Sequence, residues 1–198
     1  MNRIKKSILG IALVSSAIGF SQNSKPLSMK NMLKLGVNAG YSVPSTNAGM
    51  SVGADITYQY LVTPHFGLGV ATGHTYYFGK ENTVNNVKIE NNDFGIVPVA
   101  ALVRYYPAKK GIYFGADLGY SFITGNKYVA DNFSVERPTG GAYIKPEIGY
   151  HNRNWNVALQ YQKVFTGNSG EILSQDYNVG SLGLGVNYNI PLGKKVKK

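Results

Sequence analysis

The chain has 198 residues, a formal net charge of +10 and no cysteine. Without cysteine, disulfides, thiol catalysis and cysteine-bound metals are excluded. Three basic residues stand within the first six positions and four within the last five, so the body of the chain is only slightly basic. Because it also lacks a basic stripe with interleaved aromatics, we expect no nucleic-acid partner.

The first residues have the composition of a secretion signal. Arg3, Lys5 and Lys6 precede a short apolar stretch, and the small residues Gly19 and Ser21 occupy the −3 and −1 positions of a cleavage site. The alternative is a retained anchor helix, which usually needs about 20 apolar residues. The predicted organisation is a signal peptide over residues 1–21, one domain over residues 22–192 and a basic tail over residues 193–198.

Eight segments of the domain alternate between apolar and polar residues with a period of two. Successive side chains of a strand point to opposite faces, so this pattern predicts strands with one apolar and one polar face. In the clearest segment, Phe114 and Leu118 share the apolar parity and Asp117 falls on the other. The predicted strands cover residues 32–43, 49–60, 66–78, 94–106, 113–124, 141–150, 155–165 and 177–190.

The connections between these strands alternate in length. The tight turns, which carry the Pro, Gly and Asn that turns require, are residues 61–65, 107–111 and 152–154. The longer loops, rich in Asn, Gly and charge, are residues 79–93, 125–138 and 167–176, and the short connection 44–48 falls in the same series. Short turns at one end and longer loops at the other are typical of bacterial outer-membrane barrels.

The polar face decides which way the apolar face points. A soluble barrel buries its apolar face, whereas a membrane barrel turns that face to lipid. The polar parity holds many glycines, which would weaken water-facing strands without any packing return. In the narrow lumen of an eight-stranded barrel, however, large polar residues need small neighbours, and buried charges need partners. We therefore predict an outward apolar face and a paired lumenal charge network of Lys34, Asp55, Arg104, Asp117, Lys145 and Glu147.

Together these features predict an all-β fold, an eight-stranded antiparallel up-and-down transmembrane β-barrel in the bacterial cell outer membrane. The chain resembles the small outer-membrane β-barrel superfamily, which includes the transmembrane domain of outer-membrane protein A and its short relatives. Such proteins carry an assembly signal in the last strand, and Ser181, Gly183, Val186 and Tyr188 match its spacing. The chain departs from the family by continuing through Pro191 into the lysine tail. The resemblance implies outer-membrane lipid, lipopolysaccharide and the barrel-assembly machinery as partners.

The three histidines form no metal-binding or catalytic pattern. We expect His65 and His151 at the membrane interface beside short turns, and His74 on the outward face near the opposite rim. Lipid A deacylases of this barrel type place a His–Ser pair on the lipid-facing side, but the same-face neighbours of His74 are Thr72 and Tyr76. Because nucleophilic catalysis needs a hydroxyl within hydrogen-bond reach of its base, we expect no catalytic residue, and we also expect no metal and no cofactor.

The predicted role is therefore structural or one of surface interaction through the long loops, whose partner the sequence does not identify. Three alternatives are a narrow pore, a lipid-modifying enzyme and a soluble periplasmic lipid-binding barrel. The paired lumenal charges argue against the pore, the missing serine against the enzyme, and the glycine-rich polar face against the soluble carrier.

Overall fold

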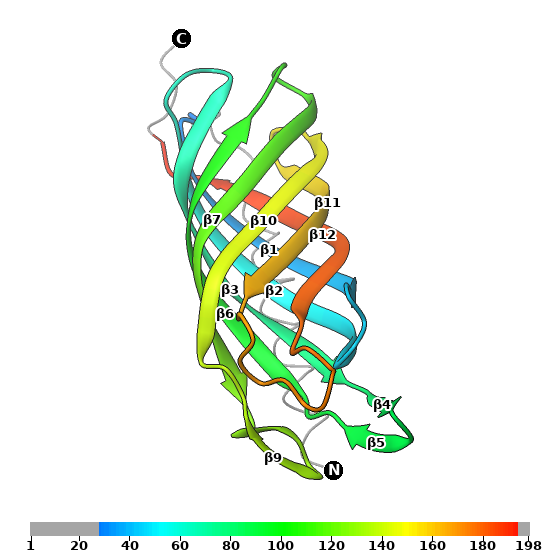
Figure 1. The fold of residues 1–198 in the computed structure, drawn as a ribbon. Helices are drawn as coiled ribbons and strands as arrows, with labels where there is room; N and C mark the ends of the chain where they lie inside the picture. Colours follow the sequence, from blue (N-terminus) through cyan, green and yellow to red (C-terminus); the bar gives the residue numbers. More distant parts are fainter. Residues whose placement is uncertain (1–27, 194–198) are drawn as a thin grey trace, which may run out of the picture.

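The structure, a computed structural model, describes residues 28–193, so the predicted signal peptide and the lysines of the tail lie outside the described residues. Eight long strands close into an antiparallel barrel in the order β1-β12-β11-β10-β7-β6-β3-β2 (Figure 1). These strands are β1 (Asn31–Ser42), β2 (Ala48–Leu61), β3 (Phe66–Gly79), β6 (Phe94–Tyr105), β7 (Gly111–Gly125), β10 (Gly140–His151), β11 (Trp155–Phe165) and β12 (Val179–Pro191). The eight predicted strands and the fold class are confirmed.

Among residues 28–193, no helix is long and apolar enough to cross a bilayer.

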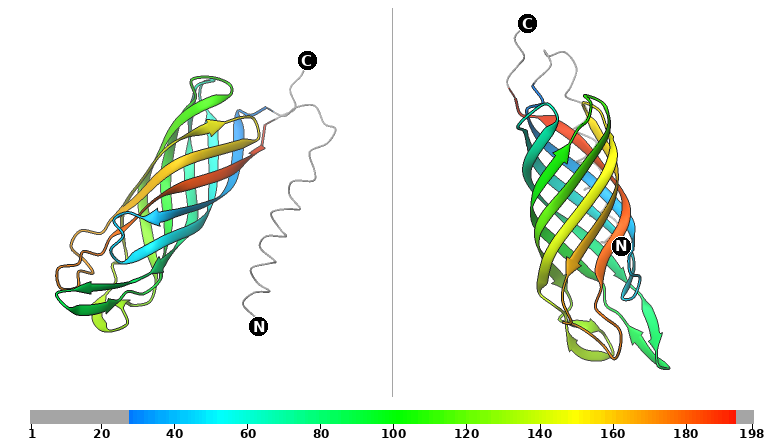
Figure 2. Two further views of the ribbon diagram at one scale, coloured as in Figure 1. Left: turned by 90° about the vertical axis from the view of Figure 1, so that its right-hand side faces the viewer. Right: turned by 45° about the horizontal axis from the view of Figure 1, so that its top comes forward.

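The barrel closes where the first strand meets the last. Over β1 and β12 the register runs without a break from Met32 opposite Pro191 to Ser42 opposite Ser181. The two ends of the barrel chain therefore lie at the same end of the molecule, together with the short turns (Figure 2). We call this the turn end, and the opposite end, which carries the connections 43–47, 80–93, 126–139 and 166–178, the loop end.

The apolar parity points outward, as predicted. On β7 the side chains of Ile112, Phe114 and Leu118 are 58%, 47% and 56% exposed, whereas Tyr113 and Asp117 are fully buried. The same alternation recurs on all eight barrel strands. The molecule therefore has an apolar exterior and buries charged side chains in its lumen, unlike a soluble protein, whose charges lie mostly on the surface.

Two of the predicted loops contain a further hairpin each. The hairpins are β4 (Glu81–Val84) with β5 (Val87–Glu90), and β8 (Tyr128–Ala130) with β9 (Phe133–Glu136). Between β4 and β5, Asn85 and Asn86 have φ values of 50° and 64°. Positive φ at both central residues is what the tightest hairpin turn requires, and asparagine tolerates it. These strands of three or four residues are too short for the alternation to reveal them.

The lumen is divided into three zones along its axis. An apolar cluster that includes Tyr77, Phe94 and Tyr177 fills the loop end, and a smaller one around Tyr106 and Tyr113 lies at the turn end. The charged residues occupy the middle of the barrel between the two clusters. Because these charged side chains are buried, they depend on one another for compensation.

Candidate functional site

The lumenal charges form one connected chain of ion pairs. Arg104 on β6 places Nη1 2.7 Å from Asp117 Oδ1 on β7 and Nε 2.6 Å from Glu147 Oε1 on β10. Lys145 on β10 lies 3.3 Å from the second oxygen of Asp117 and 3.2 Å from Asp55 Oδ1 on β2. All of these side chains are at most 9% exposed. Five of the six predicted network residues are therefore brought together.

Polar neighbours complete this network. Asn38 on β1 donates an amide hydrogen to Asp55 Oδ2 at 2.8 Å, and Arg104 donates to the backbone carbonyls of Val103 and Ala116 at 3.0 and 3.1 Å. Buried ion pairs stabilise a fold only when their remaining donors and acceptors are also satisfied. The buried charges are therefore held in one network of ion pairs and hydrogen bonds.

The lumenal glycines make room for the large polar side chains, as the sequence predicts. Gly115 stands directly opposite Arg104 in the β6–β7 register, and a Cβ at Gly115 would collide with the Arg104 side chain. In the same way, a Cβ at Gly67 would collide with the Gln59 amide. The guanidinium and the amide thus lie flat against the strands because glycine leaves the space empty.

The prediction that Lys34 belongs to the lumenal charge network was wrong, because Lys34 does not join the ion pairs. Its Nζ donates to the Tyr106 hydroxyl at 2.9 Å. With the side-chain amide of Asn156 turned so that its oxygen faces Lys34, Nζ also donates to Asn156 Oδ1 at 2.8 Å. The Tyr106 hydroxyl in turn donates to Gln59 at 2.9 Å. Among residues 28–193, no carboxylate comes within ion-pair distance of Lys34. The stagger of the strands sets Lys34 nearer the turn end than the other charges.

The expectation that His151 lies at the membrane interface was also wrong. Its ring points into the lumen at the turn end, where it is only 8% exposed, and it does not lie at the membrane interface. It packs 4.6 Å from the Tyr106 ring, and its Nε2 is hydrogen-bonded to the Ala108 carbonyl at 3.1 Å. His65 and His74 are exposed, and His74 lies on the outward face as predicted. The alternation that places Tyr150 outside also places His151 inside, so the inward position of His151 could have been predicted from the sequence.

The described residues contain no group of three or more His, Asp or Glu side chains that could hold a metal ion.

Aromatic and aliphatic side chains close the loop end. The rings of Tyr77 and Phe94 stack at 4.7 Å, and Tyr177 packs 5.4 Å from Phe94. Burial raises the pKa of the Tyr177 phenol, so this group stays neutral inside the cluster. Ile89 from β5 and Ile172 from the last loop cover these rings and are themselves at most 1% exposed. The loop sequences are thus not purely polar, since the connections 80–93 and 166–178 each supply an apolar side chain that packs at the barrel mouth.

Hydrogen bonds tie the four connections of the loop end into one assembly. Asn91 pairs with Ala130 in an isolated β-bridge between the two hairpins, and Gln175 of the last loop donates to Asn91 Oδ1 at 3.0 Å. Asn82 of β4 donates to Gln175 Oε1 at 3.0 Å. Asn47 of the short connection accepts from the backbone of Asn178 at 3.0 Å. We call this set of connected segments the loop platform; it comprises residues 44–47, 80–93, 126–139 and 166–178.

A polar hollow of about 550 Å³ opens beside the loop platform, at the outer rim of β3 and β6. Asp93 anchors one side, where it accepts hydrogen bonds from the Tyr76 hydroxyl at 2.6 Å and from the Gly79 amide at 2.7 Å. Asn126 and Asn92, joined at 2.7 Å, form part of its wall. The hollow thus combines fixed amide and carboxylate groups with the aromatic rings of Tyr76 and Phe94.

The predicted assembly-signal residues lie together on β12. Ser181 is buried and accepts a hydrogen bond from Gln162 Nε2 at 2.9 Å, whereas Val186 lies on the outward face. Tyr188 packs against Trp155 at 4.9 Å on the outside of the turn end. Their role in assembly stays a prediction.

Comparison with known proteins supports the fold alone. No protein-family model matches the sequence, and no curated protein is similar to it at a significant level. The solved structure of the Yersinia pestis outer membrane protein Ail in a phospholipid bilayer nanodisc is 15% identical, with a TM-score of 0.50 over 81% of this chain and 99% of Ail. The outer membrane protein OprG of Pseudomonas aeruginosa is 13% identical, with a TM-score of 0.50 over 85% of this chain and 98% of OprG. The chain therefore has the fold of a small outer-membrane β-barrel.

Proposed function

We propose that this protein is an integral protein of the bacterial outer membrane with a non-enzymatic role, acting as a structural element and as a surface-interaction protein through its loop platform. The observation that carries the location is the reversed polarity of the barrel. Val37, Val99 and Leu184 are 58–60% exposed on the outside, while the lumen holds the chain of ion pairs. Such an exterior suits the hydrocarbon core of a bilayer, where an apolar band of about 25 Å surrounds barrels of this size.

Rings near both ends of the strands support this location. Tyr41 and Phe122 are exposed toward the loop end, and Trp155 and Tyr105 toward the turn end. Tyr and Trp prefer the interface between lipid and water. The partners that follow from this position are outer-membrane lipid and lipopolysaccharide, and insertion would depend on the barrel-assembly machinery acting on β12.

The surface role rests on the loop platform. Rigid scaffolds commonly carry their binding residues on loops, and here the loops are held by the apolar anchors and by the bonds through Asn91 and Gln175. A preorganised surface loses less entropy on binding than a mobile one. The polar hollow beside Asp93 suits a hydroxyl-rich ligand such as a saccharide.

Cell fractionation tests the location. The protein should sediment with outer membranes, resist extraction by high salt, and migrate faster on gels when it is not boiled, because a closed barrel stays folded in mild detergent. Recovery in the soluble periplasmic fraction would contradict the proposal.

Saccharide binding tests the surface role. The protein in lipid nanodiscs is applied to an array of bacterial and host glycans, together with Asn126→Ala, which alters the hollow, and Glu171→Ala, an exposed loop position away from it. We expect binding that Asn126→Ala weakens and Glu171→Ala does not. Equal loss in both variants, or no binding to any glycan, would contradict the assignment of the hollow.

A further inference from the structure

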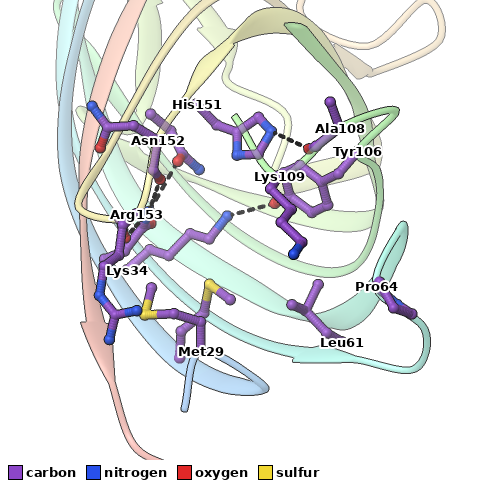
Figure 3. A pocket seen from close by; sticks show the side chains of 13 residues that line it. Met29, Lys34, Leu61, Pro64, Tyr106, Ala108, Lys109, His151, Asn152 and Arg153 are labelled. Atoms are coloured by element: carbon purple, nitrogen blue, oxygen red, sulfur yellow. Dashed lines mark hydrogen bonds between the residues drawn. The ribbon is translucent and has the colours of Figure 1, made fainter. Parts of the chain in front are cut away.

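A second pocket lies at the turn end, far from the loop platform. It measures about 340 Å³, which is within the range of pockets that hold small molecules. Lys34, Tyr106 and His151 are buried and form its floor, and the exposed turn residues Lys109 and Arg153 stand at its mouth (Figure 3). The floor is therefore part of the lumen, but the pocket opens to the solvent at the turn end.

The charge of this pocket has one sign. Its thirteen lining residues include Lys34, Lys109 and Arg153, together with His151, and none of them is an aspartate or a glutamate. Low-dielectric walls concentrate the field of such groups, which raises the local concentration of anions. The composition of the lining thus favours a negatively charged ligand.

Lys34 has the position expected of the group that would bind the anion. It is 4% exposed, and the partners described for its amino group, Tyr106 and Asn156, are neutral acceptors. The lumenal carboxylates Glu147 and Asp117 already contact Arg104 at 2.6 and 2.7 Å. An amino group has three hydrogens to donate, so Lys34 can bond an anion in the pocket without giving up either neutral partner.

The opposite wall of the pocket is apolar. Met29, Met32, Leu61 and Pro64 lie along it, and Figure 3 shows Met29, Leu61 and Pro64 on the side away from His151 and Asn152. A purely hydrated ion such as phosphate would gain nothing from these side chains. A ligand with an anionic head and a short hydrocarbon part would place its anionic head against Lys34 and bury its hydrocarbon part against the apolar wall.

We infer that the turn-end pocket binds a small organic anion, a carboxylate with a short aliphatic substituent, through Lys34. If the barrel is oriented as proposed above, the ligand enters from the periplasm. The inference does not depend on the loop platform or on its partner, since the turns that line the pocket lie at the other end of the barrel from the long loops (Figure 2).

Ligand titration followed by NMR tests this inference. The refolded protein in lipid nanodiscs is titrated with sodium butyrate, with butyramide as a neutral probe of the same shape and with inorganic phosphate as an anion without a hydrocarbon part. The variant Lys34→Met keeps the length of the side chain and removes its charge. Lys110→Met is the control, because Lys110 is an exposed lysine of the β6–β7 turn, next to Lys109, and does not line the pocket.

Lys34→Met should fold, because Asp55, Asp117 and Glu147 all keep their ion-pair partners. We expect saturable shifts with butyrate at residues of the pocket and much weaker effects of butyramide and phosphate. Lys34→Met should weaken butyrate binding about tenfold or more, the size of effect expected for losing a charge-assisted hydrogen bond, and Lys110→Met should leave it unchanged.

Several results would overturn the inference. These are the absence of saturable butyrate shifts in the wild-type protein, equal binding of butyrate by Lys34→Met, and binding of butyramide or phosphate as tight as that of butyrate. Dispersed amide spectra and retained gel mobility of Lys34→Met would show that any loss of binding does not come from misfolding.

Discussion

Lys145 on β10 and Asp55 on β2 stand on opposite sides of the barrel, four strands apart in either direction, and yet Lys145 Nζ lies 3.2 Å from Asp55 Oδ1. This pair crosses the whole lumen. Together with Asp117 and Arg104 it joins β10, β2, β7 and β6 through buried charges. The middle of the lumen is thus held together by long polar side chains, while the exterior of the barrel is predominantly apolar.

Removing the central carboxylate should destabilise the barrel strongly. Asp117 contacts both Arg104 and Lys145 and is fully buried. Asp117→Ala leaves both cations short of a partner, which costs about 3–5 kcal/mol when a buried pair is broken on one side. Reversible urea unfolding in lipid vesicles measures the change in the free energy of unfolding. Asp131→Ala, at an exposed loop position, is the control, and an equally small effect of both variants would argue against the network.

A charge on the outside should be tolerated according to its depth in the bilayer. Leu118 and Ile112 are equally exposed on the same strand, but Leu118 is in the middle of β7 and Ile112 lies near its turn end. Leu118→Arg should lower the free energy of unfolding by about 2–4 kcal/mol and Ile112→Arg by about 0–1 kcal/mol. Unfolding in vesicles gives both values. The reverse order would contradict the lipid-facing assignment.

The lumen should conduct poorly. The ion pairs of Arg104 and Lys145 block its middle, and the stacked rings of Tyr77 and Phe94 cover the loop end. Planar-bilayer recordings of the purified protein should therefore show little or no steady conductance. Stable openings of the size seen in porins would show that this obstruction is not a fixed part of the fold.

The loop platform should face the outside of the cell and the turn end the periplasm. The chain has no native cysteine, so single-cysteine variants report position cleanly. On intact cells, a membrane-impermeant maleimide should label Asp131→Cys in the loop platform, and it should label Asn154→Cys in the last turn only after the outer membrane is permeabilised. Labelling in the opposite order would invert the topology and remove the basis for the surface role.

The sequence by itself determined the strands, their parity and the small neighbours of the lumenal side chains. The alternation that puts Leu118 outside and Asp117 inside is a property of adjacent residues on an extended chain, so it needs no knowledge of the fold. The space that Gly115 leaves for Arg104 follows from the same parity, since a narrow barrel cannot hold two large side chains at one level. The six buried charges were therefore predictable as a set.

Only the tertiary structure decided which of these charges meet. Asp55 and Lys145 are 90 residues apart, and their contact depends on the stagger of strands that is fixed when β1 closes on β12. The same stagger sets Lys34 beside Tyr106 and away from the carboxylates. The hairpins of the loop platform could not be predicted either, because each is too short to show alternation and is held by side chains such as Asn91 and Gln175 from different loops. Parity is local and survives in the sequence, whereas contacts across a lumen arise only once the barrel has closed.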